Sequence, residues 1–167
     1  MQKAVLVVMG SDSDFPVMEP CLKTLDSFQI PYQVRICSAH RSPAAAARLA
    51  QNAAGDGFSV IIAAAGLAAH LPGVIAAWTS LPVIGVPIKT GALAGQDALL
   101  AIVQMPAGIP VATVAIDGAA NAAILAVQIL AIASPGLQTR LAEHKAALAA
   151  SVAERQDRLD KKMAERV

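Results

Sequence analysis

In Tyr32-Gln33-Val34-Arg35-Ile36-Cys37 apolar and polar side chains alternate, and Ser38-Ala39-His40-Arg41-Ser42-Pro43 follows directly. The alternation predicts a strand, and the Ser-Pro pair predicts the N-cap and first position of a helix. His40 and Arg41 therefore belong to a strand-to-helix loop, where free helix amides bind anions. Because histidine titrates near neutrality and arginine keeps its charge, we predict an anion site with a proton carrier.

The same unit of strand and helix recurs along the chain, which indicates a parallel sheet with helical crossovers. The predicted strands are Ala4–Val8, Gln33–Cys37, Val60–Ala63, Val83–Val86 and Val111–Ile116. The predicted helices are Pro16–Phe28, Pro43–Ala54, Leu71–Trp78, Gln96–Val103 and Ala119–Ile132. We expect an α/β protein built as a three-layer α/β/α sandwich around a five-stranded parallel sheet.

The length of 167 residues fits a single domain with a sizeable core. We expect an α/β core over residues 1–134 and a long C-terminal helix over 135–167, whose helical pattern is clearest over Leu137–Val167. One apolar stripe on this charged helix is marked by Leu141, Leu148, Val152 and Leu159. The pattern leaves two alternatives open, a solvated helix and a helix packed on a neighbouring subunit.

The amino-acid composition limits the kinds of partner that the protein is expected to bind. A net charge of +1 and an aromatic content of 3% argue against nucleic acid and favour a small-molecule ligand.

The middle of the chain carries very little charge: between Gly57 and Gly136 the charged residues are Lys89, Asp97 and Asp117. No apolar run there reaches the roughly 18–20 residues of a membrane span, so we expect no membrane association. Such an apolar surface predicts a homo-oligomer, and Ala119–Ala133 should be buried on all sides by the core or by a subunit interface.

Three smaller features bear on compartment and cofactors. The segment Met1–Val5 does not resemble a signal peptide, which predicts a cytoplasmic protein. Cys21 and Cys37 lack CxxC spacing and are expected to be reduced, buried thiols. Scattered histidines without a cysteine cluster predict no metal site.

Polar residues gather after the first three predicted strands, at Gly10–Asp14, Ser38–Pro43 and Ala65–Gly73. In an open parallel sheet these strand ends share one edge, where ligands bind. The hydroxyls of Ser11 and Ser13 suit a phosphate, while Asp14 suits either a helix N-cap or sugar hydroxyls. The segment matches neither a Walker loop nor GxGxxG, so a monophosphate is favoured over a triphosphate or a dinucleotide.

Four segments in this order resemble the signatures of the PurE family of N5-carboxyaminoimidazole ribonucleotide mutases: Gly10–Asp14, Ser38–Pro43, Ala68–Gly73 and Ile102–Pro106. The resemblance implies a flavodoxin-like subunit in a homo-octamer, with active sites near subunit junctions. It also implies a reaction of purine (IMP) biosynthesis, in which the N5 carboxylate leaves as carbon dioxide and is re-added at C4 of the aminoimidazole ring. It implies no metal, nucleotide or biotin cofactor.

The resemblance also implies roles for individual residues. His40 would be the general acid and base, and His70, in the loop that encloses the carboxylate, would also be a catalytic residue. The residues expected to bind the ribonucleotide and its carboxylate are Ser11, Asp14, Ser38, Arg41, Ala65, Gly66 and Leu71. The loop from Ala65 to Leu71 would enclose the carboxylate or the carbon dioxide.

The pairing of His40 with His70 resembles the mutase more than the related carboxylase that uses free carbon dioxide. The chain departs from the family in Ala64-Ala65-Gly66-Leu67, where Gly-Ala-Gly-Gly is usual. Other departures are Ser42 for threonine, and Ala44, Ala98 and Ala101 for aspartate, serine and serine. Because leucine resists the positive φ that glycine adopts, Leu67 leaves a non-catalytic, nucleotide-binding relative as an alternative.

Overall fold

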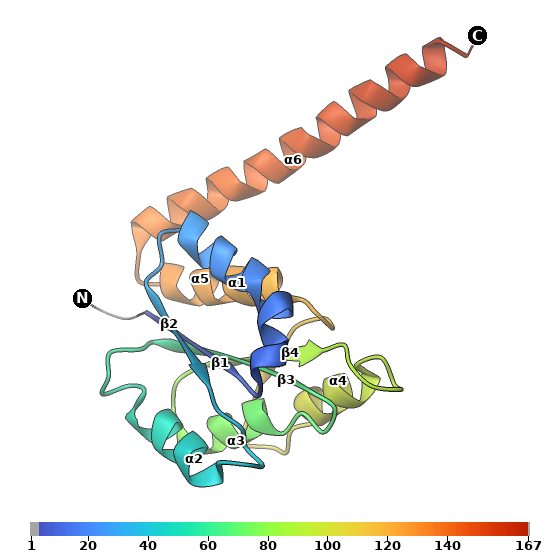
Figure 1. Cartoon of the computed structure of the whole chain (residues 1–167). Coiled ribbons are helices and arrows are strands. Elements are labelled where there is room, and N and C mark those ends of the chain that lie inside the picture. The colour runs from blue at the N-terminus through green and yellow to red at the C-terminus, as the bar shows by residue number, and fades with distance from the viewer. Residues whose placement is uncertain (1–3, 167) are drawn as a thin grey trace.

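The computed structural model describes residues 4–166, and Met1–Lys3 and Val167 lie outside the described residues. Most of the segment Met1–Val5, on which the cytoplasmic prediction rests, is therefore not described. Within residues 4–166, five parallel strands form one sheet in the order β2-β1-β3-β4-β5 (Figure 1). The strands are β1 (Val5–Met9), β2 (Tyr32–Ile36), β3 (Val60–Gly66), β4 (Val83–Ile88) and β5 (Ala112–Thr113). The helices are α1 (Phe15–Ser27), α2 (Pro43–Asn52), α3 (Leu71–Trp78), α4 (Gln96–Val103), α5 (Ala119–Ala131) and α6 (Pro135–Ala164), with a 3-10 turn η1 (Asp12–Asp14) before α1.

The central strands are buried on both faces because helices cover both faces of the sheet. From β1, Val5 and Val7 pack toward α1 and α5, whereas Leu6 and Val8 pack toward α2, α3 and α4. Figure 1 shows α1 and α5 above the sheet and α2, α3 and α4 below it. The predicted three-layer α/β/α sandwich is confirmed, and its strand order is the flavodoxin-like one.

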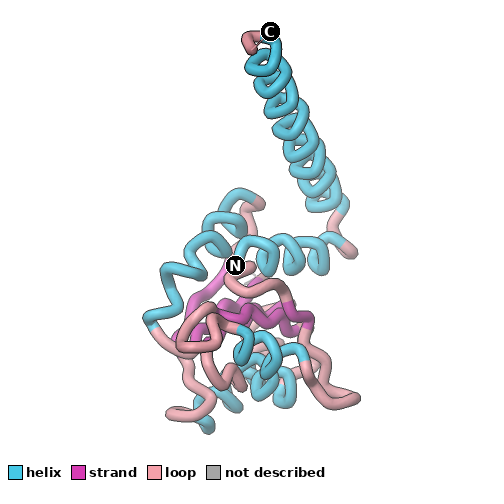
Figure 2. Tube along the Cα trace, turned by 90° about the vertical axis from the view of Figure 1, so that its right-hand side faces the viewer, coloured by secondary structure: helices cyan, strands magenta, loops and turns pink. Residues whose placement is uncertain are grey.

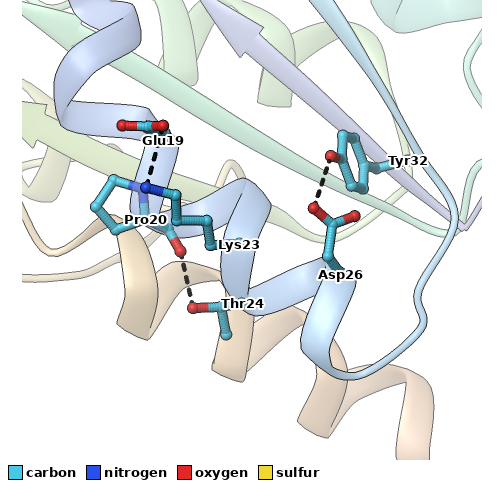
Figure 3. Close-up of polar contacts among 6 residues, drawn as sticks. All are labelled: Glu19, Pro20, Lys23, Thr24, Asp26 and Tyr32. Carbon is cyan, nitrogen blue, oxygen red and sulfur yellow. Dashed lines mark hydrogen bonds and ion pairs between the residues drawn. The ribbon is translucent and has the colours of Figure 1, made fainter.

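A side-chain hydrogen bond links helix α1 to the edge strand β2, and further polar contacts lie within α1 (Figure 3). The hydroxyl of Tyr32 donates to a carboxylate oxygen of Asp26 at 3.3 Å. Desolvation, followed by the nearby Asp26 charge, raises the pKa of Tyr32, so this hydroxyl keeps its proton. Pro20 lies inside the helix, and its carbonyl accepts a hydrogen bond from the Thr24 hydroxyl at 2.8 Å.

The fifth strand is shorter than predicted. The run Val111–Ile116 was expected to be a strand, but only Ala112–Thr113 pairs regularly with β4. Pro87 of β4 has no N–H to donate at the next step of the ladder. The chain then leaves the strand, and the amide of Asp117 donates to the Pro87 carbonyl at 2.9 Å.

Within one chain, helix α5 is buried on one face, so the predicted burial on all sides now depends on the subunit-interface alternative and stays a prediction. Its alanine face, including Ala122 and Ala126, is fully buried against α1 and the sheet. Asn121 and Gln128, seven residues apart and hence on one face, are exposed, and Ile132 at the helix end is 81% exposed. Among residues 4–166, Ile132 is the most exposed large apolar side chain.

Helix α6 packs on the body only near its start. Leu137 and Leu141 contact the core, and the guanidinium of Arg140 donates to the Phe28 carbonyl at 2.6 Å. Beyond this the helix projects away from the domain (Figures 1 and 2). The rest of the predicted apolar stripe, Leu148, Val152 and Leu159, is exposed. In the part of the chain that the structure describes, no helix combines the length and apolarity needed to cross a membrane.

Candidate active site

A cavity of about 430 Å³ lies at the carboxyl ends of β1 and β3. These neighbouring strands lead to helices on opposite faces of the sheet, α1 and α3, so the cavity occupies the point where strand order reverses. All the predicted site residues line it: Ser11, Asp14, Ser38, His40, Arg41, Ala65, Gly66, His70 and Leu71. The three segments that the sequence placed on one edge therefore surround one space.

The segment after β1 is closed by a reciprocal capping box. The amide of Ser11 donates to Asp14 Oδ2 at 3.1 Å, and the amide of Ser13 donates to Ser11 Oγ at 3.3 Å. Asp14 occupies the predicted N-cap position of α1, but its side chain folds back on Ser11 and makes no capping bond to that helix. Burial raises the pKa of Asp14, although the amides of Ser11 and Gly10 partly oppose that shift.

In the segment after β2, Ser42 and Pro43 occupy the predicted N-cap and N1 positions of α2. The Ser42 hydroxyl does not cap the helix; it accepts from the Ser38 amide at 3.3 Å and donates to the Ser38 carbonyl at 3.0 Å. The Ser38 hydroxyl accepts from the Arg41 amide at 3.1 Å, and Arg41 Nη2 donates to the Gly10 carbonyl at 3.3 Å. This chain of bonds fixes the guanidinium between the first two segments.

The two histidines touch. His40 Nε2 and His70 Nδ1 are 2.7 Å apart, and the rings stand edge to face with an interplanar angle of 85°. Since a hydrogen bond needs one donor and one acceptor, only one of the two facing nitrogens carries a proton. A proton exchanged with a ligand therefore enters or leaves a linked pair of imidazoles.

The segment after β3 forms an apolar wall. Leu67 has φ 54°, and tight turns follow, with Ala69 N bonding Leu67 O and His70 N bonding Ala68 O, both at 2.8 Å. These turns lead to Leu71, the first residue of α3, which is 2% exposed. The chain thus places leucine at a positive φ, the conformation that its side chain was expected to resist.

Sequence reasoning missed Thr90, which lines the cavity from the loop after β4. The same strand-end rule that located the other segments also applies to β4 and could have found it. No polar cluster marks this loop in the sequence, and its closeness depends on Gly66, where a Cβ would meet the Thr90 methyl group.

The remaining reactive groups lie elsewhere. Burial raises the pKa of Cys21 to about 12, so this thiol keeps its proton, and Cys37 is also a buried free cysteine. Among residues 4–166, no cluster of three or more His, Cys, Asp or Glu side chains is arranged to hold a metal ion.

Comparison with known proteins identifies the family. The family model described as AIR carboxylase matches residues 4–151. The N5-carboxyaminoimidazole ribonucleotide mutase of Pyrococcus horikoshii is 54% identical over 154 residues, which cover 92% of this chain and 87% of the relative. The mutase of the same name from Mycobacterium tuberculosis H37Rv is 56% identical over 147 residues, covering 88% and 84%. The crystal structure of Treponema denticola PurE superposes with a TM-score of 0.85 at 27% identity, covering 93% of this chain and 98% of that one. The resemblance inferred from four short segments is confirmed, and the chain belongs to the AIR carboxylase family.

Proposed function

We propose that this protein is an N5-carboxyaminoimidazole ribonucleotide mutase of purine biosynthesis. It moves the carboxylate of its substrate from the exocyclic N5 to C4 of the aminoimidazole ring. The observation that carries the proposal is the 2.7 Å contact between His40 and His70. It sets a proton carrier where the polar segments after β1 and β2 meet the apolar wall after β3.

The polar lining suits a ribonucleotide monophosphate. Arg41, oriented by Ser38 and Gly10, presents a planar fork that grips phosphate oxygens. Ser11 adds a hydroxyl and the Asp14 carboxylate accepts from ribose hydroxyls. A cavity of about 430 Å³ lies within the range of small-ligand sites.

The histidine pair supplies the protons for both halves of the reaction. Protonated His40 gives its proton to N5 while the N5–carboxylate bond breaks, and the electron pair of that bond stays on nitrogen. The products of this half are aminoimidazole ribonucleotide and carbon dioxide. C4 then attacks the carbon dioxide, and the neutral imidazole takes the C4 proton, so no proton is gained or lost overall.

The apolar wall completes the site. Ala65, Gly66 and Leu71 enclose the carbon dioxide between the two halves, and His70 holds His40 through their shared hydrogen bond. The proposed mechanism uses no metal, no nucleoside triphosphate and no biotin.

The proposed assembly is a cytoplasmic homo-octamer. Residues 1–134 form the catalytic unit, and the helix over 135–167 packs on a neighbouring subunit. Support comes from the exposed apolar end of α5 at Ile132 and from the uncovered stripe of α6.

The direct test is incubation of the purified protein with N5-carboxyaminoimidazole ribonucleotide without ATP. We expect 4-carboxyaminoimidazole ribonucleotide, and His40→Asn should slow its formation by about 10²–10⁴-fold, the usual size of general acid–base catalysis. His144→Asn is the matched control, because His144 lies on α6 against Phe28 and outside the cavity.

Three outcomes would contradict the proposal. Binding of the nucleotide without turnover would favour the non-catalytic relative. Product formation that starts only from aminoimidazole ribonucleotide and depends on added bicarbonate would favour the carboxylase. An unchanged rate in His40→Asn would remove the role given to that residue.

A further inference from the structure

Leu67 occupies an unfavourable backbone conformation at the edge of the cavity. It follows β3 directly, has φ 54°, and is 54% exposed. A left-handed conformation costs an L-residue with a side chain about 1–2 kcal/mol. Strain of this kind persists where the surroundings enforce it, and it is a reason to ask what the side chain does there.

The side chain of Leu67 rests on the loop after β4. A Cβ added to Gly91 would lie 2.6 Å from Leu67 Cδ2, closer than real Cβ contacts come. One residue earlier in each segment, Gly66 leaves room for the methyl group of Thr90 in the same way. The last residue of β3 and the residue after it thus meet two successive residues of the loop after β4, and these two contacts form a seam that requires glycine at 66 and 91.

This seam borders the apolar part of the cavity. The apolar wall is lined by Ala65, Leu67, Ala68 and Leu71. Leu71 forms the buried part of this wall, and Leu67 is the large apolar side chain at its solvent side. Carbon dioxide is neutral and has no hydrogen-bond donor, so an apolar compartment holds it without the cost that such a compartment imposes on bicarbonate.

From this geometry we infer that Leu67 is an enclosing residue, which seals the carbon dioxide compartment by bridging the loops after β3 and β4. The inference rests on the proposed mutase reaction and assigns to Leu67 the retention of carbon dioxide between its two halves. The side chain slows exchange of carbon dioxide with the medium. It does not touch the phosphate or the ribose.

The test measures escape directly. The protein converts unlabelled N5-carboxyaminoimidazole ribonucleotide in ¹³C-bicarbonate buffer that contains carbonic anhydrase. Two quantities are measured: the ¹³C content of the product, and the amount of aminoimidazole ribonucleotide released from the protein. We expect Leu67→Gly to raise both by ~5-fold over the wild-type protein, as removal of a half-buried leucine from the seal implies. The KM for the nucleotide should stay within about twofold, because the polar lining is unchanged.

Leu67→Gly should fold, because glycine adopts this φ without strain. Ala94→Gly is the matched control: Ala94 also has a positive φ, of 50°, but does not line the cavity, so ¹³C incorporation should stay at the wild-type level. Gly91→Ala should also leak carbon dioxide, because its Cβ displaces Leu67. The double variant of Leu67→Gly and Gly91→Ala should leak no more than Leu67→Gly alone, since both changes break one contact.

Wild-type levels of ¹³C and free aminoimidazole ribonucleotide in an active Leu67→Gly variant would overturn the role of Leu67 and leave the mutase proposal intact. Equal leakage in Ala94→Gly would overturn it as well, by tracing the effect to backbone strain. Failure of the wild-type protein to convert the substrate would instead overturn the proposed function, and with it the basis for this role.

Discussion

At the residue scale, a few polar side chains line the cavity, and hydrogen bonds between them hold them in place. Ser38 orients Arg41, and His40 contacts His70 across two loops. The residue types and their edge of the sheet were predictable from sequence. The fold-back of Asp14 onto Ser11 was not, because aspartate at this position suits either a cap or a ligand and only the local turn decides between them.

Asp14→Asn separates binding from stability. Loss of the carboxylate should raise the KM by about 10–100-fold, the usual value of a hydrogen bond to a charged group. Asparagine keeps an oxygen that accepts from the Ser11 amide, so the variant should stay folded. Steady-state kinetics with the N5-carboxylated substrate provides the measurement, and an unchanged KM would contradict the assignment.

The same variant tests the raised pKa of Asp14. Because burial raises this pKa in the folded protein, the folded state binds the proton more tightly than the unfolded chain. The group therefore favours folding below its ordinary pKa of 3.8 and opposes folding as the pH rises through the raised value. Urea titrations across this range should show a smaller loss of unfolding free energy with rising pH in Asp14→Asn than in the wild-type protein. A steeper loss in the variant would contradict the sign of the shift.

Substitution of His70 should slow the reaction less than substitution of His40. His70→Asn leaves the proton carrier in place but removes its ring partner, so we expect kcat to fall by ~10-fold, less than in His40→Asn. Single-turnover rates of the two variants should be compared, with binding of aminoimidazole ribonucleotide measured in parallel. A larger loss for His70→Asn would make His70, and not His40, the principal proton carrier.

At the element scale, local signals predicted most boundaries and neighbouring strands explain the main exception. α3 and α4 match their predicted ranges, and α2 begins where the Ser-Pro pair indicated. The fifth strand stops early because Pro87, on the adjacent strand, removes a donor. That effect depends on which strands are neighbours, so periodicity within Val111–Ile116 does not contain it.

The loop between β2 and α2 depends on one hydroxyl. Ser42→Ala removes both bonds between that hydroxyl and the Ser38 backbone, and should lower the free energy of unfolding by about 1–2 kcal/mol. Ser42→Thr keeps the hydroxyl and should retain most of the stability. Chemical denaturation of both variants is the measurement, and equal losses would show that the hydroxyl is not what stabilises the loop.

At the scale of the whole molecule, the fold leaves apolar surface that one chain does not cover. The alanine face of α5 is buried, but Ile132 is 81% exposed and most of α6 projects from the body. The sequence indicated this excess of apolar residues. The sequence does not determine which face of α5 stays exposed, because that depends on the packing of its alanine face against α1 and the sheet.

Ile132→Asp tests whether this surface holds subunits together. A charge at this exposed position should leave the fold intact and shift the sedimentation of the protein toward smaller species. Asp56→Lys, a charge change at an exposed turn, serves as the control. Unchanged sedimentation of Ile132→Asp would exclude Ile132 from the interface.

The central claim is that His40 stands over the reacting ring while Arg41 and Asp14 hold the ribonucleotide. It is tested most directly by the distance from the nearest His40 ring nitrogen to C4 in a structure with bound 4-carboxyaminoimidazole ribonucleotide. The account predicts about 3–3.5 Å, the reach of a reacting pair, with the phosphate on Arg41. A ring turned away from His40, or a phosphate seated on the histidine pair, would contradict it.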